Sequence, residues 1–266
     1  MNELFSLALG WGAARGLAHI GVIKRLEELW VTPREISGTS IGAIIGAFYA
    51  SGYNAHEMIQ IANSIKMLQL LDFDLKNWLL KGNKIIKFLE KYIWKRTFAD
   101  LKIPLSIVAT NIDTGEKIIF REWLLIDAIR ASIGIPGIFI PYKHRGMYLV
   151  DGWIIENLPI SILSKEYPII AVSVQLQMKK YIREKKSFFF PNGTILSNSY
   201  NILRKTIQIM MFQNELKSIQ SRNNVTIIRL EREDIDYYNF MKMDNMIEEG
   251  HRSSQILLDF FSPHNK

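Results

Sequence analysis

The stretch LALGWGAARGLAHIGV at residues 7–22 decides the fold, because it reads as a strand, a glycine-rich turn and a helix. Residues 4–9 form a short apolar run, and from residue 17 onward apolar side chains recur at helical spacing. A turn between a strand and a helix directs its backbone N–H groups at a space the size of an anion. The first question is therefore which anion this turn holds with Trp11 inside it.

Two well-known phosphate-binding patterns do not fit the turn. The pattern G-x-x-x-x-G-K-[ST] is absent, and the dinucleotide pattern G-x-G-x-x-G requires glycine at position 15, where arginine stands. The remaining use is an oxyanion hole, in which amides hold the negative charge that develops during acyl transfer. The turn contains Gly10, Gly12, Ala13, Ala14 and Arg15, and it ends at Gly16.

A second strand–turn–helix unit carries the candidate nucleophile. The sequence GTSIG at residues 38–42 fits G-x-S-x-G, with an apolar strand before it and a helix after it. This pattern lifts Ser40 out of a sharp turn, and small neighbours such as Gly38 and Gly42 let the backbone fold tightly. The helix N-terminus favours negative charge beside the hydroxyl. A capped helix between two glycines would leave the same pattern.

A third turn follows the strand at residues 147–150 and reads DGW. It places the Asp151 carboxylate at a strand end, where ligands of α/β proteins bind, with Gly152 next to it. An ordinary Asp-Gly turn is an equally simple interpretation.

Strands and helices alternate through the first half, which predicts an α/β sandwich with a mainly parallel sheet. No repeat or linker divides the chain, so residues 1–266 are expected to form one domain. Residues 179–199 are expected to be a mobile loop, and residues 243–261 a closing helix.

Composition narrows the chemistry. The chain has no cysteine, which excludes a thiol nucleophile and leaves serine as the leading candidate. Its net charge of +7 suits an anionic partner, either nucleic acid or anionic lipid. No nucleic-acid recognition motif is present, and no signal peptide or membrane span is apparent. We expect a cytoplasmic protein that binds no nucleic acid, metal or cofactor.

Together, GWGAARG, GTSIG and DGW resemble the motifs of the patatin-like phospholipase family, in that family's order. The stretches ATNIDTGEKIIF, IRASIGIPGIFIPY and VDGWIIENLPI resemble its other conserved blocks. The resemblance covers roughly residues 4–174, and residues 248–258 look like the closing helix of bacterial members.

This resemblance implies a three-layer α/β/α fold and a serine lipid acyl hydrolase that acts on phospholipids or lysophospholipids. By similarity, Ser40 is the nucleophile and Asp151 the base of a Ser–Asp dyad. The resemblance further implies an oxyanion hole formed by Gly10, Gly12, Ala13, Ala14 and Arg15, with Gly16 as support. Arg15 either braces the turn or meets substrate phosphate.

Two alternatives stay open. A general esterase with a Ser40–Asp151–His251 triad follows the chain order of α/β-hydrolases, although His251 lies in the predicted closing helix. A non-catalytic lipid-binding relative is suggested by Trp11, Ala13 and Trp153, which stand where many family members carry small residues or glycine. Ala13 cannot adopt a positive φ as cheaply as glycine. Whether the two tryptophans line the same mouth is left open; if they do, they narrow the acyl entrance and favour slim or short acyl chains.

The stretch KKYIREKKSFFFP at residues 179–191 combines a basic run with three phenylalanines. Phe188, Phe189 and Phe190 are expected to insert into the surface of an anionic membrane while the basic residues meet headgroup phosphate. A surface loop or a dimer contact would have the same composition.

Overall fold

The computed structural model describes residues 4–65, 71–74, 79–175, 195–230 and 243–262. Its strands are β1 (Ser6–Leu9), β2 (Glu35–Thr39), β3 (Phe73–Asp74), β4 (Leu79–Leu80), β5 (Leu105–Asn111), β6 (Lys117–Phe120), β7 (Tyr142–His144), β8 (Met147–Asp151), β9 (Ile169–Ser173) and β10 (Val225–Arg229). Its α-helices are α1 (Ala18–Glu28), α2 (Ile41–Ala50), α3 (Ala55–Asn63), α4 (Asn83–Ile93), α5 (Leu125–Ser132), α6 (Trp153–Glu156), α7 (Ile195–Gln220), α8 (Met243–Ser253) and α9 (Ile256–Phe260). The 3₁₀ helices are η1 (Ala13–Leu17) and η3 (Phe98–Asp100).

The main sheet has eight strands in the order β10-β9-β1-β2-β5-β8-β7, with β6 paired to β5. The pairs among β10, β9, β1, β2 and β5 are parallel, and those that involve β6, β7 and β8 are antiparallel. The sheet is thus mainly parallel, as predicted. Because parallel strands end at one edge, the turns after β1 and β2 lie next to each other.

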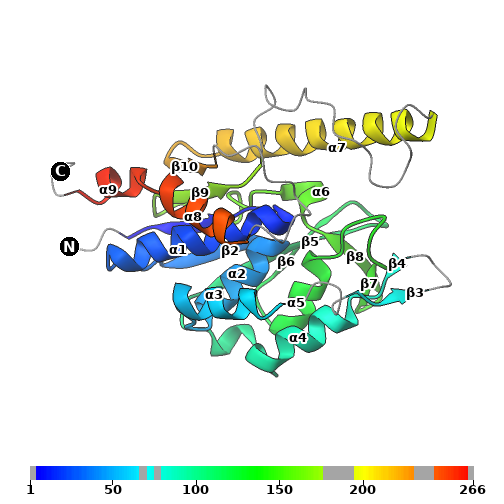
Figure 1. Ribbon diagram of the computed structural model, residues 1–266, viewed down its shortest axis with the longest axis horizontal. Helices are drawn as coiled ribbons and strands as arrows, with labels where there is room; N and C mark the ends of the chain where they lie inside the picture. Colours follow the sequence, from blue (N-terminus) through cyan, green and yellow to red (C-terminus); the bar gives the residue numbers. More distant parts are fainter. Residues whose placement is uncertain (1–3, 66–70, 75–78, 176–194, 231–242, 263–266) are drawn as a thin grey trace.

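Helices cover both faces of the sheet and make three layers (Figure 1). Side chains alternate along each strand, so Leu7 and Leu9 join the core under α1, α2, α5 and α8, while Ala8 faces the opposite layer. That opposite core is smaller and includes Leu158, Ile160 and Ile219, the last from α7. The predicted three-layer α/β/α fold is confirmed.

The closing helix packs directly on α1, the helix that follows the glycine turn. A Cβ on Gly250 of α8 would overlap the carbonyl oxygen of Ala18, and one on Gly21 of α1 would overlap that of Ile247. The two backbones therefore touch, which fixes the start of α1. Residues 243–261 are not one helix as predicted, because the chain turns at 254–255, where the buried Ser254 hydroxyl donates to His251 O at 2.7 Å.

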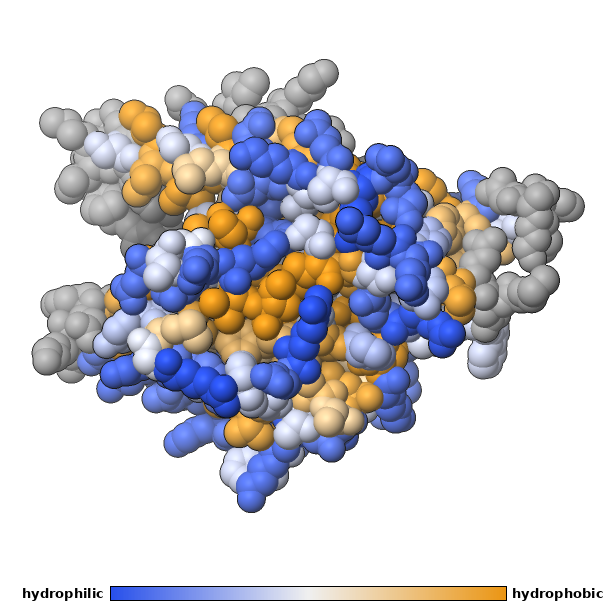
Figure 2. Space-filling view, turned by 180° about the vertical axis from the view of Figure 1, so that it is seen from behind, coloured by the Kyte–Doolittle hydropathy of each residue, from blue (hydrophilic) through white to orange (hydrophobic). Residues whose placement is uncertain are grey.

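The predicted mobile loop at residues 179–199 needs correction, because α7 begins at Ile195 and residues 195–199 are helical. Residues 176–194, and with them Phe188, Phe189 and Phe190, lie outside the described residues. The sequence did not reveal α7 because its buried positions are mostly polar: Gln208, Met211, Glu215 and Ser218. Apolar side chains lie on its exposed side instead, at the upper left of the molecule in Figure 2.

Candidate active site

Ser40 is the single residue between β2 and α2, and its backbone is strained. Its φ of 58° and ψ of −121° lie in a region that residues other than glycine rarely occupy. The Ser40 amide donates to the Ser132 hydroxyl at 2.8 Å, which ties the turn to the end of α5. An observed outlier of this kind points to function, because the surrounding structure must hold it in place.

The two glycines of GTSIG are required by close backbone contacts. A Cβ on Gly38 would lie 2.6 Å from the carbonyl oxygen of Gly42 and 2.7 Å from Ala43 Cα. A Cβ on Gly42 would overlap the carbonyl oxygen of Leu9 and lie 2.8 Å from that of Gly10. The serine turn and the glycine turn therefore pack against each other backbone to backbone.

The glycine turn leaves only part of its amides free. Gly10 N donates to Val172 O at 3.1 Å, and Arg15 N donates to Gly12 O at 3.0 Å. These two amides are already used, which corrects the expectation that Gly10 and Arg15 belong to the oxyanion hole. In the described part of the chain, the amides of Gly12, Ala13 and Ala14 have no hydrogen-bond acceptor.

Ala13 takes the positive φ that the sequence made doubtful for a residue with a Cβ, since its φ is 45°. The left-handed region costs an L-residue roughly 1–2 kcal/mol. The surrounding turn imposes this conformation, which aims successive amides to one side. The neighbouring glycines let the turn pack this closely. A Cβ on Gly12 would overlap the Val174 side chain, and a Cβ on Gly16 would overlap the Ile41 side chain.

Two buried side chains brace the turn from inside. Arg15 is fully buried and its Nε donates to Val174 O at 2.8 Å, which fits the bracing role rather than contact with substrate phosphate. His19 Nε2 lies 2.8 Å from Gly10 O. Burial lowers the pKa of His19 to about 4, so the neutral ring donates this hydrogen bond at physiological pH.

Asp151 is the last residue of β8 and is fully buried beside Ser40. Its amide donates to Gly134 O at 2.9 Å, and its Oδ1 accepts from Trp153 N at 3.0 Å. Gly152 allows the tight turn, because a Cβ there would overlap the carbonyl oxygen of Val108. Backbone contacts thus fix the position of the carboxylate.

The charge state of Asp151 follows from its burial. Burial raises the pKa of this carboxyl to about 8, against the lowering effect of the Ser40 hydroxyl and of the amides of Trp153 and Gly152. Within the described residues, Oδ2 has no hydrogen bond of ordinary geometry, so the contact with Ser40 is long or misaligned. Catalytic hydrogen bonds often tighten only when substrate binds.

Trp11 and Trp153 lie together, with ring centroids 6.3 Å apart. They form an apolar cluster with Ala13 and with Met211 and Ile207 of α7. Ser40 is only 3% exposed. Helix α7 therefore packs on the tryptophan pair that flanks the turn and Asp151.

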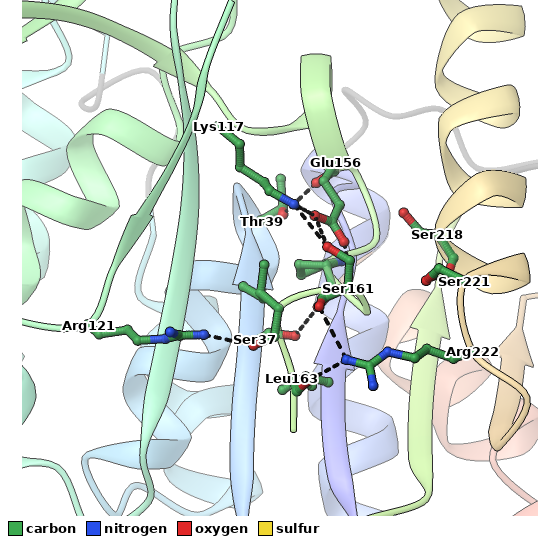
Figure 3. A network of polar contacts seen from close by, with 12 residues as sticks. Ser37, Thr39, Lys117, Arg121, Glu156, Ser161, Leu163, Ser218, Ser221 and Arg222 are labelled. Atoms are coloured by element: carbon green, nitrogen blue, oxygen red, sulfur yellow. Dashed lines mark hydrogen bonds and ion pairs between the residues drawn. The ribbon is translucent and has the colours of Figure 1, made fainter. Parts of the chain in front are cut away.

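A polar network fixes the chain that follows Asp151 (Figure 3). Glu156 is buried, and its carboxylate accepts from Lys117 Nζ at 2.7 Å and from both Ser161 N and Ser161 Oγ at 2.8 Å. Thr39, next to Ser40, donates its hydroxyl to Glu156 O at 2.9 Å. The serine turn and the Asp151 turn are thereby joined through one buried carboxylate residue.

His251 does not lie beside the candidate nucleophile. Its Nε2 is 2.8 Å from a carboxylate oxygen of Glu28, the last residue of α1. Since α1 begins beside the glycine turn at Ala18, ten residues of helix carry Glu28 about 15 Å away from it. The geometry gives the Ser–Asp–His alternative no support.

Comparison with known proteins settles the family. The family model for patatin-like phospholipases matches residues 7–164, more than half of the chain. The chain belongs to the patatin-like phospholipase family. The matched segment contains the glycine turn, Ser40 and Asp151.

Individual relatives agree with this assignment. An uncharacterised NTE family protein of Mycobacterium bovis is 35% identical over 175 residues, which cover 64% of this chain and 48% of that protein. Lysophospholipase NTE1 of Scheffersomyces stipitis is 31% identical over 183 residues, covering 65% of this chain and 12% of that protein. This patatin-like chain therefore spans about half or less of the length of these relatives.

Among solved structures, VipD from Legionella pneumophila aligns with a TM-score of 0.61 at 14% identity, over 97% of this chain and 67% of that chain. At this identity the likeness establishes a shared fold. Within the described residues of this patatin-like chain, no helix has both the length and the hydropathy needed to cross a bilayer.

Several residues that shape the site were not singled out from the sequence. Ser132 holds the Ser40 amide, Asn157 O accepts from Trp11 N at 2.8 Å, and Met211 covers the tryptophan pair. The block IRASIGIP contains Ser132, so the family resemblance pointed to its neighbourhood. No sequence pattern connects Met211 to the glycine turn, because contact across 200 residues of chain depends on tertiary packing.

Proposed function

We propose that the protein is a serine lipid acyl hydrolase that cleaves carboxylic ester bonds of phospholipids or lysophospholipids. The observation that carries the proposal is the strained Ser40 turn beside the buried Asp151 carboxyl. The amides of Gly12, Ala13 and Ala14 in the adjacent turn have no acceptor in the described chain. Membership of the patatin-like phospholipase family and the lysophospholipase relative support the lipid class of substrate.

In the proposed reaction, deprotonated Asp151 takes the proton of the Ser40 hydroxyl as its oxygen attacks the ester carbonyl. The carbonyl oxygen becomes an oxyanion, which the amides of Gly12, Ala13 and Ala14 stabilise. Each such donor is typically worth about 10²–10³ in turnover. The bond to the alcohol breaks, and the alcohol leaves with the proton held by Asp151. Water, activated by the same carboxylate, then hydrolyses the acyl-enzyme.

The first test is hydrolysis of a short-chain p-nitrophenyl ester by the wild type and by Ser40→Ala. We expect release of p-nitrophenol by the wild type and loss of at least about 10³-fold in Ser40→Ala, because the acyl-enzyme can no longer form. His251→Ala is the matched control and is expected to keep most of the activity. Equal rates for wild type and Ser40→Ala would refute the hydrolase and favour a lipid-binding relative.

The second test identifies the substrate. The protein is incubated with diacyl phospholipids and with lysophospholipids of several headgroups, and the released fatty acids are analysed. We expect ester cleavage in at least one of these two lipid classes. Release from p-nitrophenyl esters alone would instead indicate a general esterase. The proposed partners are thus a phospholipid substrate and an anionic membrane surface; the contact expected from Phe188, Phe189 and Phe190 stays a prediction.

A further inference from the structure

Helix α7 exposes a stripe of apolar side chains where a surface helix normally exposes polar ones. Helices that cover a core normally bury their apolar stripe and expose their polar one. In α7 four large apolar side chains are instead 45% to 66% exposed. They form what we call the apolar face of α7: Ile202, Leu203, Ile209 and Met210. Figure 2 shows apolar side chains gathered at the upper left of the molecule, where the first half of α7 lies.

Polar contacts hold the buried side of α7 in place along its second half. Glu215 is buried, accepts from Ser173 Oγ at 2.9 Å and pairs with Arg229 at 2.6 Å. Asn214 Nδ2 donates to Ile154 O at 2.9 Å. The orientation of the helix is thus fixed by buried hydrogen bonds, so the apolar face is held outward by the fold.

The charge around this face favours an anionic partner. Residues 195–214 contain no Asp or Glu, and the exposed Lys205 lies three residues after Ile202 and four before Ile209 on the same helix. The first acidic residue of α7 is Glu215, which is buried and paired. An apolar helix face with a basic side chain beside it and no acidic one is the pattern that lies in the headgroup region of an anionic bilayer.

The position of the face also suits a lipid surface. The other side of the same helix contributes Ile207 and Met211 to the cluster around Trp11 and Trp153. The apolar face is therefore within one helix diameter of the tryptophans that flank the candidate dyad.

We propose that the apolar face of α7 docks the protein on the surface of an anionic lipid bilayer. The choice of a lipid occupant rests on the proposed function, since a bilayer is where the proposed substrate resides. Docking places the side of the protein that carries the tryptophan cluster next to the lipid. The face is distinct from the Phe188–Phe190 stretch, which lies outside the described residues.

The test measures, by co-sedimentation, how strongly the parent and its variants bind vesicles that contain phosphatidylcholine and about one third phosphatidylglycerol. All proteins carry Ser40→Ala, so the vesicles stay intact and binding does not depend on the proposed chemistry. The docking variant replaces the four residues of the apolar face by glutamine, a good helix former. We expect its binding to fall at least about tenfold, because four exposed apolar side chains no longer leave water on docking.

A matched variant changes four other exposed apolar side chains to glutamine, away from α7. These residues are Ile112, Leu124, Ile256 and Leu258. We expect it to bind like the parent. Circular dichroism and thermal unfolding check that both variants fold; if the fourfold α7 variant does not, Ile202→Gln/Leu203→Gln is expected to lower binding about threefold on its own.

Equal vesicle binding by the parent and the folded α7 variant would overturn the proposal, as would a parent that does not bind anionic vesicles. A parent that is dimeric by light scattering and an α7 variant that is monomeric, with no change in vesicle binding, would show that a second copy covers this face. Ester hydrolysis is measured separately, in proteins that retain Ser40. If the α7 substitutions abolish vesicle binding but not hydrolysis of a soluble ester, docking and catalysis are independent. A parent that binds vesicles but hydrolyses no ester would refute the proposed function and leave the docking face standing.

Discussion

The two strand–turn–helix units at the centre of the sheet have the same architecture and expose different chemistry. Strands β1 and β2 pair in parallel with Leu9 opposite Gly38, so their turns begin side by side. After β1 the chain takes residues 10–17 to reach α1, whereas after β2 Ser40 alone leads into α2. The long turn can present several backbone amides, while the one-residue turn presents a side chain. Turn length therefore separates the proposed oxyanion donor from the proposed nucleophile.

Both turns contain a residue with a side chain at positive φ, Ala13 at 45° and Ser40 at 58°. The strain is held by contacts between the turns, chiefly Gly42 against the carbonyl oxygen of Leu9. Each unit thus depends on the other for its geometry. Substitutions in either unit, or at the junction between them, are expected to expose this dependence.

Asp151→Asn removes the proposed base while it preserves the shape of the side chain. The proposed nucleophile on the turn after β2 needs this carboxylate as its base, whereas the amides on the turn after β1 do not. We expect hydrolysis of a p-nitrophenyl ester to fall by about 10²–10⁴, the usual contribution of a general base. The far-UV spectrum should stay unchanged, since Asn can still accept from Trp153 N. Activity within tenfold of wild type would remove Asp151 from the reaction.

The raised pKa of Asp151 gives two opposite pH dependences. Only the deprotonated form is a base, so kcat/KM should rise with pH and reach half its plateau near the pKa of about 8. The native carboxyl keeps its proton up to about pH 8, whereas the unfolded one, with a pKa of 3.8, releases it. Between these values the native state binds more protons, so the free energy of unfolding falls as pH rises. Denaturant titrations between pH 4 and about 8 should show that Asp151→Asn lacks this pH-dependent part of the free energy of unfolding.

Gly42→Ala breaks the junction between the two units. The added Cβ would overlap the Leu9 carbonyl oxygen, and backbone atoms cannot move aside cheaply. We expect the free energy of unfolding to drop by about 2–3 kcal/mol and activity to fall with it. Gly46→Ala on the same helix is the control, because its Cβ would meet the ends of the Ile36 and Leu105 side chains at 3.2 and 3.3 Å. Similar losses in both variants would contradict a specific role of the Gly42 contact.

Ser40→Gly against Ser40→Ala isolates the backbone strain of the serine turn, because both variants lack the hydroxyl. Glycine accepts φ 58° and ψ −121° without a Cβ penalty. We expect Ser40→Gly to be about 1 kcal/mol more stable than Ser40→Ala, after the entropy of the extra glycine is subtracted. Ala13→Gly should show a smaller gain by the same urea titration. No difference between the two Ser40 variants would mean that the turn is unstrained.

Much of the site was predictable because it is encoded locally. The strand predicted at residues 147–150 is observed as β8, Met147–Asp151, because a short apolar run before an Asp-Gly turn depends only on adjacent residues. The turn glycines, Ser40 and Asp151 follow from short patterns whose geometry depends on neighbouring residues. What failed was α7, whose buried side is polar and whose register is set by Glu215, Arg229 and Ser173 far apart in the chain.

The sequence by itself determined the fold class and which residues occupy the three turns, since hydrophobic periodicity and small residues act over a few positions. Tertiary structure alone decided which amides of the glycine turn stay free, because Gly10 N meets Val172 O only when β9 lies beside β1. It also decided the raised pKa of Asp151, which comes from complete burial. Burial and hydrogen-bond partners come from distant parts of the chain, and no local pattern specifies them.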